Sequence, residues 1–288
     1  MNPSLVSIAP MMDWTDRHCR YFYRLISKNT QLYTEMITAK AILNGDKNRL
    51  LDFNAQENPL TLQLGGSDPS EMAKCALIAQ EWGYDEVNIN VGCPSDRVFS
   101  GNFGACLMKE PDLVASCVES MIDNCNIPVT VKSRIGIDDM ESYEQLSDFI
   151  MRIHNKGCQH FIIHARKAWL QGLSPKENRT IPPLNYPWVY QLKKDFPQLK
   201  ITINGGIENC SEVKKHLDYV DGVMLGRSVY HNPFLLREID VRIFGNKKNL
   251  LDREQILKKY MLYIKQQIKI GVPMRSMTRH ILGLYHGE

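Results

Sequence analysis

The sequence predicts a (β/α)8 barrel followed by a small helical part. Eight short runs rich in apolar and β-branched residues alternate with helical patterns over about 225 residues, a size typical of this barrel. Glycines follow the seventh and eighth runs, at positions 205, 206 and 226, where such barrels frequently bind phosphate. The alternative, an open doubly wound sheet, is disfavoured because no G-x-G-x-x-G motif follows the first run.

The predicted strands are short, and helix signals separate most of them. The strands span 6–9, 32–34, 60–64, 86–90, 129–132, 160–163, 200–203 and 222–225. We expect a helix over 69–82, because Asp68 can cap its first turn and Pro69 suits its first position. Asn209 and Glu212 have capping-box spacing and predict another helix start.

The barrel pattern ends near residue 244, and a further helix is predicted over 253–270. Asp252 can cap its start, while Gly271 and Pro273 can end it. Its predicted buried side consists of Ile256, Leu257, Tyr260, Met261, Ile264 and Ile268, which recur at helical spacing. We therefore expect a barrel over 1–244 and a helical part over 245–288.

The formal net charge of +3 is divided unevenly between these two parts. Residues 245–288 hold nine Lys and Arg against three Asp and Glu, a net +6, whereas residues 1–244 hold 26 against 29, a net −3. The segment 165–187 is also basic, with Arg166, Lys167, Lys176 and Arg179 against Glu177, and its prolines oppose regular helix. These segments indicate a polyanionic partner, and the alternative is a lysine-rich helix surface that only contacts water.

Composition excludes several classes of protein. With 43% hydrophobic and 23% charged residues, the chain has the composition of a soluble globular protein. It shows no secretion signal and no run of about 18 apolar residues, so we expect neither export nor a membrane span. None of the eight cysteines has C-x-x-C spacing. We expect a cytoplasmic protein without a metal site, whose thiols are mostly buried.

Polar residues gather at the ends of the predicted strands, where barrel active sites form. They include Glu35, Gln63, Asn88, Asn90, Lys132, Arg134, His164, Asn204 and Arg227, and Pro10 and Met11 follow the first strand. Glycine backbone at the last two ends would bind phosphate oxygens, and Arg227 would add a charged clamp. A phosphate-bearing ring such as a flavin would suit this set, although the glycines could instead serve only tight turns.

Cys93 lies directly after the fourth strand, between Gly92 and Pro94. The glycine permits unusual backbone angles and the proline favours an extended Cys93, so the thiol could be presented at the mouth as proton donor or nucleophile. Position alone leaves an inert thiol equally open. Cys106, on a glycine-containing loop, is the rival thiol.

Long motifs along nearly the whole chain resemble the tRNA-dihydrouridine synthases. They are APMMDWTDRHCR, LQLGGSDP, NINVGCPSDRV, VKSRIGIDD, FIIHARKAWLQGLSPKENR, INGGI and DGVMLGR. The segment ARKAWLQGLSPKENRTIPPLNYP is similar to the one that distinguishes the synthase A subfamily. The resemblance implies an FMN-dependent barrel and a helical tRNA-binding part over 245–288. That part would be truncated, because family members usually continue beyond the position of His286-Gly287-Glu288.

The resemblance also implies a reaction and roles for named residues. The family reduces the C5–C6 double bond of uridines in tRNA, here uridines 20 and 20a of the D-loop, with NADPH (or NADH) as electron donor. Cys93 would protonate C5, with hydride supplied to C6 by FMN. Asn90 would contact the uridine, and Lys176 and Arg179 the tRNA. FMN would bind Pro10, Met11, Gln63, Lys132, His164, Asn204, Gly205, Gly206, Gly226 and Arg227.

The physical demands of the reaction agree with that assignment. A uridine in folded tRNA must leave its stack before its C6 can be reached, and basic contacts elsewhere must offset that cost. We expect a monomer without a protein partner. Three alternatives stay open: a flavin enzyme acting on a free pyrimidine or another small molecule, an aldolase-like barrel with Lys132 as Schiff base, and an inactive RNA-binding protein.

Overall fold

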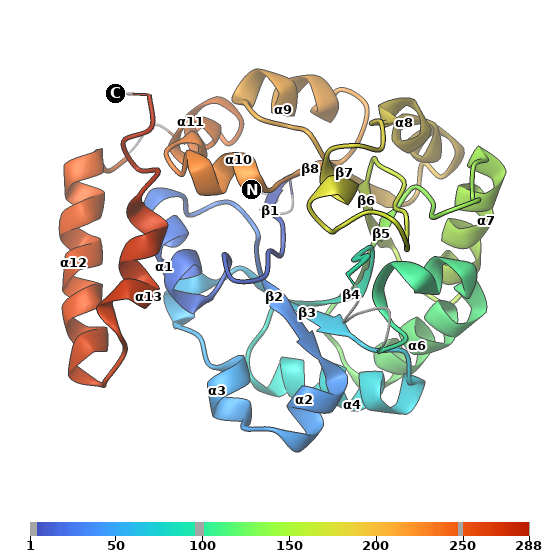
Figure 1. The fold of residues 1–288 in the computed structure, drawn as a ribbon, viewed down its shortest axis with the longest axis horizontal. Helices are drawn as coiled ribbons and strands as arrows, with labels where there is room; N and C mark the ends of the chain where they lie inside the picture. Colours follow the sequence, from blue (N-terminus) through green and yellow to red (C-terminus); the bar gives the residue numbers. More distant parts are fainter. Residues whose placement is uncertain (1–4, 96–100, 247–249, 288) are drawn as a thin grey trace.

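Eight parallel strands form a ring in the computed structural model, which describes residues 5–95, 101–246 and 250–287 (Figure 1). The strands are β1 (Val6–Ile8), β2 (Leu32–Thr38), β3 (Leu60–Gly65), β4 (Glu86–Val91), β5 (Val129–Arg134), β6 (His160–His164), β7 (Lys200–Asn204) and β8 (Gly222–Leu225). Hydrogen-bonded neighbours follow the order β1-β8-β7-β6-β5-β4-β3-β2, so consecutive strands lie side by side.

The ring closes between β1 and β2. Ser7 and Gln31 form an isolated parallel bridge. The amide of Ile8 donates to the carbonyl of Gln31 (2.9 Å), and the amide of Gln31 donates to the carbonyl of Val6 (3.0 Å). A closed ring leaves no free strand edge. The predicted barrel is confirmed, and the doubly wound alternative is wrong.

The strands begin at the predicted residues, but most of them end later than predicted. β2 shows the largest difference, because it continues to Thr38 and so includes Glu35, which was expected to follow it. β5 likewise continues to Arg134, which pairs with His164 on β6. The prediction relied on apolar side chains. Strands pair through backbone N–H and C=O groups, which polar residues also carry, so a strand can continue past its apolar residues.

Helices separate the strands and cover the outside of the ring (Figure 1). They are α1 (Arg17–Ile26), α2 (Ala39–Asn44), α3 (Lys47–Leu51), α4 (Pro69–Glu81), α6 (Pro111–Asn124), α7 (Tyr143–His154), α8 (Tyr186–Asp195), α9 (Cys210–Leu217), α10 (Arg227–His231) and α11 (Leu235–Arg242), with 3-10 turns η2 (Ala55–Glu57), η3 (Gly104–Lys109) and η4 (Glu177–Arg179). The predicted caps are confirmed: Asp68 accepts from the amide of Glu71 and Asn209 from that of Glu212.

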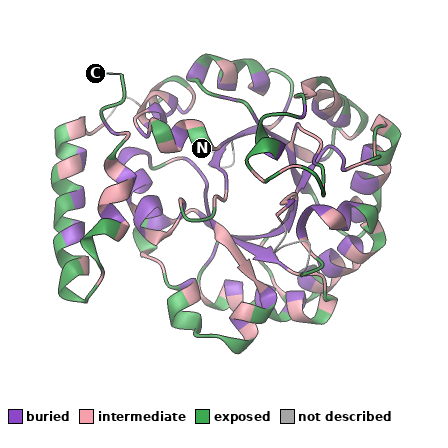
Figure 2. Ribbon diagram, viewed as in Figure 1, coloured by how far each residue is buried: buried purple, intermediate pink, exposed green. Residues whose placement is uncertain are grey.

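The main apolar core lies between the ring and these helices. Figure 2 shows most strand residues coloured as buried, except the second half of β2, which is intermediate, whereas the outer sides of the helices are exposed. A second, small apolar cluster consists of Ala9, Tyr33, Ile162 and Met224. The buried residues of the strands also include many polar ones: Thr61, Gln63, Glu86, Asn88, Asn90, Thr130 and Thr202. Each of these seven side chains is hydrogen-bonded, as buried polar groups usually are.

After the barrel, α12 (Arg253–Lys269), α13 (Met274–Thr278) and the 3-10 turn η5 (Arg279–Ile281) pack beside α1 (Figure 1). The ring of Tyr263 stacks on Tyr21 with centroids 4.0 Å apart, and its hydroxyl lies 2.7 Å from Nδ1 of His18. These aromatic contacts with α1 anchor the helical part to the barrel.

Within the described ranges, no helix is long and apolar enough to cross a bilayer.

The predicted buried side of α12 is partly wrong. Tyr260 and Ile264 are buried as expected, but Met261 and Ile268 are 47% and 45% exposed. Tyr263, which the prediction left out, is 3% exposed because it packs on α1. The Asp252 cap is confirmed. Of the basic residues assigned to this part, Lys247 and Lys248 lie outside the described residues.

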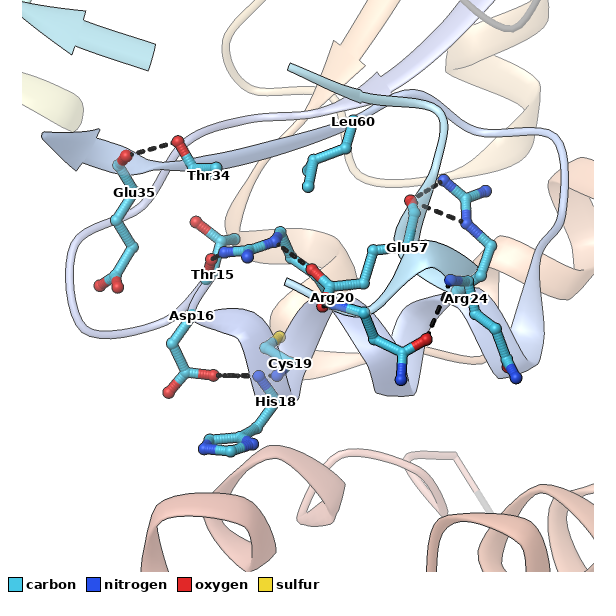
Figure 3. Close-up of polar contacts among 12 residues, drawn as sticks. Thr15, Asp16, His18, Cys19, Arg20, Arg24, Thr34, Glu35, Glu57 and Leu60 are labelled. Atoms are coloured by element: carbon cyan, nitrogen blue, oxygen red, sulfur yellow. Dashed lines mark hydrogen bonds and ion pairs between the residues drawn. The ribbon is translucent and has the colours of Figure 1, made fainter. Parts of the chain in front are cut away.

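Asp16 joins the start of α1 to the end of the chain. Its carboxylate caps α1 by accepting from the amides of His18 and Cys19, both at 2.9 Å, as Figure 3 shows for His18. The same carboxylate pairs with Arg279 (2.5 Å) and with His280 (3.0 Å). One side chain therefore connects the barrel to α13 and η5.

A buried ion pair holds the segment before β3 against α1. Nε of Arg20 lies 2.7 Å from a carboxylate oxygen of Glu57, and both side chains are almost inaccessible (Figure 3). Arg24 donates to the carbonyl of the same glutamate at 2.8 Å. Each charge is thereby paired and hydrogen-bonded, the condition for burying an ion pair without leaving either charge unsatisfied.

Candidate active site at the barrel mouth

The strand ends bring the predicted site residues together at one end of the ring. Contacts join the ends pairwise: Gln63 to Asn90, Asn90 to the Cys93 loop, Lys132 to Asn204, His164 to Gly205, and Arg227 to Arg179. Met11 lies near Gly226. Pro10 precedes Met11 at the end of β1. Lys176 belongs to the same loop as Arg179 but is exposed beyond these contacts.

Cys93 lies on a short loop after β4 that is fixed by its own strand. Oδ1 of Asn90 accepts hydrogen bonds from the amides of Gly92 (3.0 Å) and Cys93 (3.1 Å). The thiol is partly exposed, and its Sγ lies 3.4 Å from Oγ of Ser95. The backbone therefore holds the thiol in place while leaving it accessible, as a proton donor requires.

The predicted contact of Asn90 with a uridine stays a prediction. Its Oδ1 already accepts two amides, and its Nδ2 donates to Gln63 Oε1 (3.1 Å) and lies 3.2 Å from Sδ of Met36. The side chain is 9% exposed. In this structure its polar atoms serve the loop and the neighbouring strands.

Lys132 and Asn204 connect β5 to β7 across β6. Nζ of Lys132 donates to Oδ1 of Asn204 at 3.1 Å, and Nδ2 of Asn204 donates to the carbonyl of Met224 at 2.8 Å. Burial, and then the charge of Arg134, lowers the pKa of Lys132 to about 7. The amine of Lys132 therefore titrates near neutral pH, and an anionic ligand beside it would stabilise the protonated form.

His164 packs directly on the backbone of Gly205. A Cβ at Gly205 would lie 2.5 Å from Cδ2 of His164, and the φ angles of Gly205 and Gly206 are 112° and 70°. Only glycine combines that conformation with that close approach. Burial, and then the charges of Arg134 and Lys132, lower the pKa of His164 well below its usual value. The imidazole is therefore neutral at pH 7.

Met11 and Gly226 meet where β1 and β8 end. Sδ of Met11 lies 4.0 Å from the position that a Cβ of Gly226 would take. The amide of Met11 donates to Oγ1 of Thr15 at 2.9 Å, which fixes the turn after β1. Gly206 is exposed and Gly226 is half-buried, whereas Gly205 is buried under His164. Accessible backbone of the kind that binds phosphate is therefore offered by Gly206 and Gly226.

Four arginines lie at this end of the ring: Arg134, Arg166, Arg179 and Arg227. Within 5–95, 101–246 and 250–287, none of them forms an ion pair with Asp or Glu. Nε of Arg166 is buried and has no hydrogen-bond partner. Burial, and then the charge of Arg227, lowers the pKa of Arg179. An anionic group at the mouth would satisfy these donors, so the residues present fit a phosphorylated cofactor.

The basic segment 165–187 is held over β6 and β7 by Asn178, which is fully buried. Its Oδ1 accepts from the amide of Trp169 (2.8 Å), and its Nδ2 donates to the carbonyls of Trp169 (2.9 Å) and Leu173 (3.1 Å). As predicted, little regular helix forms in this segment: η4 lies within it, and α8 begins only at Tyr186, at its end. The segment is a structured loop that presents Lys176 and Arg179.

Arg134 is a site residue to which the sequence analysis gave no role. It is 3% exposed, and its guanidinium donates to the carbonyls of Gly92 (3.1 Å) and Asn178 (2.9 Å). It therefore joins the Cys93 loop to the basic loop. The position of Arg134 after the apolar start of β5 was the available signal, but its two partners are backbone carbonyls about 40 residues away in either direction.

Cys106, the rival thiol, has a different environment from Cys93. It lies on η3, and its Sγ donates to the carbonyl of Phe103 at 3.1 Å. Burial raises the pKa of this thiol. The amide of the preceding residue, Ala105, donates to the carbonyl of Cys93 at 2.9 Å, so η3 supports the Cys93 loop. This arrangement favours Cys93 as the reactive thiol.

The sequence matches known proteins over nearly its whole length. A family model described as Dihydrouridine synthase (Dus) matches residues 7–288. A Synechocystis sp. protein is 58% identical over 288 residues, which cover 100% of this chain and 86% of that protein. One from Vibrio vulnificus is 58% identical over 281 residues (97% and 86%), and one from Escherichia coli is 57% identical over 282 residues (98% and 81%). All three are named tRNA-dihydrouridine(20/20a) synthase.

Proposed function

The chain belongs to the dihydrouridine synthase family, and from this premise we propose that it reduces uridines 20 and 20a in the D-loop of tRNA. The observation that carries the proposal is the accessible Cys93 thiol, held beside unpaired cations at the mouth of the barrel. A cationic mouth suits an anionic cofactor and an RNA backbone, and a fixed thiol suits proton transfer to carbon.

FMN is the proposed cofactor, and when bound it supplies hydride for C6 of the uridine, with NADPH (or NADH) as the electron source. The protein's own residues would bind and orient it. Gly205, Gly206 and Gly226 would present backbone to the phosphate, with Arg227 as its charged partner. Lys132, Asn204, His164, Gln63, Met11 and Pro10 would contact the rest of the cofactor.

Cys93 is proposed to donate the proton that C5 of the uridine acquires. A thiol held beside the substrate can act as a general acid and then be reprotonated by water. The nearby positive groups of Lys132, Arg134 and Arg179 would stabilise the thiolate left after transfer. The neutral imidazole of His164 would offer a hydrogen bond rather than a charge.

The basic surfaces are the proposed tRNA contacts. Lys176 and Arg179 on the ordered loop would bind the RNA near the mouth, and the helical part from residue 245 onward would bind it farther away. These contacts would offset the cost of unstacking the target uridine, a few kcal/mol. We propose a monomeric, cytoplasmic enzyme with a barrel over 1–244 and a helical tRNA-binding part over 245–288.

A matched pair of cysteine variants tests the proposal. Purified protein should bind FMN and form dihydrouridine at positions 20 and 20a of tRNA from cells that lack this gene. Cys93→Ala should lower turnover by about 100-fold or more, as for loss of a general acid, and keep the flavin absorbance. Cys106→Ala is the control and should keep most activity. Full activity in Cys93→Ala, or turnover of free uracil as fast as tRNA, would contradict the proposal.

A further inference from the structure

A line of buried side-chain hydrogen bonds runs through the barrel from the Cys93 loop to Glu86. It begins at the amides of Gly92 and Cys93, which donate to Oδ1 of Asn90. Its further steps are Asn90 Nδ2 to Gln63 Oε1 (3.1 Å), Gln63 Nε2 to Asn88 Oδ1 (2.8 Å), Asn88 Nδ2 to Thr130 Oγ1 (2.9 Å), and Thr130 Oγ1 to Glu86 Oε1 (2.9 Å). We call these five side chains the interior line.

The direction of every bond in the interior line is set at its two ends. At the mouth, the backbone N–H groups of Gly92 and Cys93 can only donate. At the other end, an ionised carboxylate can only accept. The amides between them have one donor side and one acceptor side, so a single orientation satisfies all the bonds. A reversed amide anywhere would set donor against donor or acceptor against acceptor.

The side chains of the interior line are buried, so each of them depends on its neighbours in the line for hydrogen bonds. Glu86 is 8% exposed and Asn90 is 9% exposed, while the three members between them are at most 1% exposed. A polar group that loses its partner there has little access to water, and leaving it unsatisfied is costly. A change at one end is therefore transmitted to the next side chain rather than absorbed by solvent.

Glu86 is held as an acceptor by its surroundings. Its Oε1 accepts from the hydroxyls of Tyr33 (3.0 Å), Thr61 (3.2 Å) and Thr130. Its Oε2 lies 3.9 Å from Nδ1 of His160. Burial opposes ionisation, but the interaction with His160 and these hydroxyls outweigh it, so the pKa of Glu86 is lowered.

We propose that Glu86 is a positioning residue for Cys93, acting through the interior line to hold Asn90 Oδ1 against the amides of the Cys93 loop. This inference rests on the proposed function only in taking Cys93 as the reactive thiol. It assigns Asn90 to the orientation of the loop. It also gives a role to Glu86, a carboxylate buried inside the barrel.

Thr130→Val tests the line without changing the shape of the residue. The variant removes the acceptor of Asn88 and a donor to Glu86, so Asn88, Gln63 and Asn90 lose their fixed orientation. We expect iodoacetamide to alkylate Cys93 about fivefold faster, the effect of one lost hydrogen bond, as read by site-resolved mass spectrometry. Alkylation of Cys125 in the same sample should not change. In turnover, kcat should fall by a similar factor with little change in KM for tRNA.

Two threonine variants make the test specific. Thr130→Ser keeps the hydroxyl and should restore the wild-type rate of Cys93 alkylation. Thr30→Val is the matched control: Thr30 is as buried as Thr130, and its hydroxyl is hydrogen-bonded to Oγ of Ser27 (3.3 Å), outside the interior line and its partners. Equal acceleration in Thr30→Val would show general loosening of the barrel and overturn the proposal. An unchanged Cys93 rate in Thr130→Val would also overturn it.

Glu86 itself is tested by a double-mutant cycle. Glu86→Ala should accelerate Cys93 alkylation in the wild-type background, and add nothing once Thr130 is valine. Independent effects would contradict action through Thr130. If Thr130→Val does not fold, Asn88→Ala breaks the line at its next member, with the same outcomes. Because alkylation needs no turnover, it decides this proposal separately, whereas wild-type protein that cannot reduce tRNA would contradict the proposed function.

Discussion

Lys132 shows how the fold tunes a single residue. Burial and Arg134 hold its pKa near 7, far below the value of about 10.4 in an unfolded chain. The folded protein therefore binds fewer protons than the unfolded chain between these two values. The stability of the protein without flavin should fall as pH decreases from about 10 towards 7, and this group should add no further change below 7.

Lys132→Met should remove that pH dependence. From pH 9.5 to 7.5, the free energy of unfolding of the wild type should fall relative to the variant by about 1 kcal/mol, reduced from a maximum of about 2.7 because the side chain is partly exposed. Urea unfolding of flavin-free protein at the two pH values measures the difference. Lys265→Met, on the exposed surface of α12, should follow the wild type. A parallel response in all three proteins would contradict the assignment.

Some site residues could be predicted from the sequence because they end strands. Lys132, His164 and Asn204 follow apolar runs, and the barrel topology brings such ends together. Arg134 could not be assigned, because its partners are the backbone carbonyls of Gly92 and Asn178. Backbone acceptors leave no pattern in a sequence, so a contact between two loops becomes visible only in the folded chain.

At the scale of elements, the loop 165–187 depends on one buried amide. Asn178→Ala would leave unsatisfied the backbone groups of Trp169 and Leu173 that it now binds, at a cost of about 1–3 kcal/mol. We expect limited proteolysis to cut the variant within this loop, and tRNA affinity to fall by several-fold while FMN binding changes little. Lys176→Ala should weaken tRNA binding without exposing the loop to protease. A protease-resistant Asn178→Ala protein would contradict this account.

The joint between α1 and the chain end consists of the ion pairs that Asp16 forms with Arg279 and His280. Burial opposes the charge of its carboxylate, but His280, the amide of Cys19 and Arg279 together hold the pKa of Asp16 well below its usual range. Asp16→Asn keeps a good helix cap and loses the charge, so at pH 7 it should cost about 2 kcal/mol. That difference is complete above the ordinary value of about 3.9 and should shrink as pH falls below it.

Thermal or urea unfolding across pH measures this difference against a surface control. Asp52→Asn breaks the ion pair with Arg17, in which both side chains are substantially exposed. Such pairs contribute up to about 1 kcal/mol, so this variant should be nearly as stable as the wild type. If the two asparagine variants lose equal stability at pH 7, the joint is no stronger than a surface ion pair.

Helix starts and strand starts were predicted correctly where local sequence alone determines them. Strand starts follow the onset of apolar residues, and the caps at Asp68, Asn209 and Asp252 follow local hydrogen bonding. The buried side of α12 was not, because Tyr263 is buried through its stacking on Tyr21 of a helix more than 240 residues earlier. Helical spacing identifies apolar positions but not which neighbouring helix covers them.

At the scale of the whole molecule, charge is separated between the barrel and the helical part. The exposed lysines of α12 include Lys265 and Lys269, and α12 lies at the side of the barrel beside α1 (Figure 1). If this surface binds the tRNA backbone, each contact releases counterions, so affinity depends on salt. If the lysines of α12 contribute to the salt dependence of tRNA binding, this helix contacts the RNA. If they do not, its lysines contact only water.

The double variant Lys265→Glu, Lys269→Glu should therefore weaken tRNA binding at low salt and lower the slope of log Kd against log salt concentration by about 1 to 2. Filter binding from about 50 to 200 mM salt measures that slope. Lys214→Glu, Lys215→Glu on α9 makes the same charge change on another exposed helix and should alter it little. Equal slopes in the two double variants would mean that net charge alone attracts the RNA, because only a bound surface makes the position of the lysines matter.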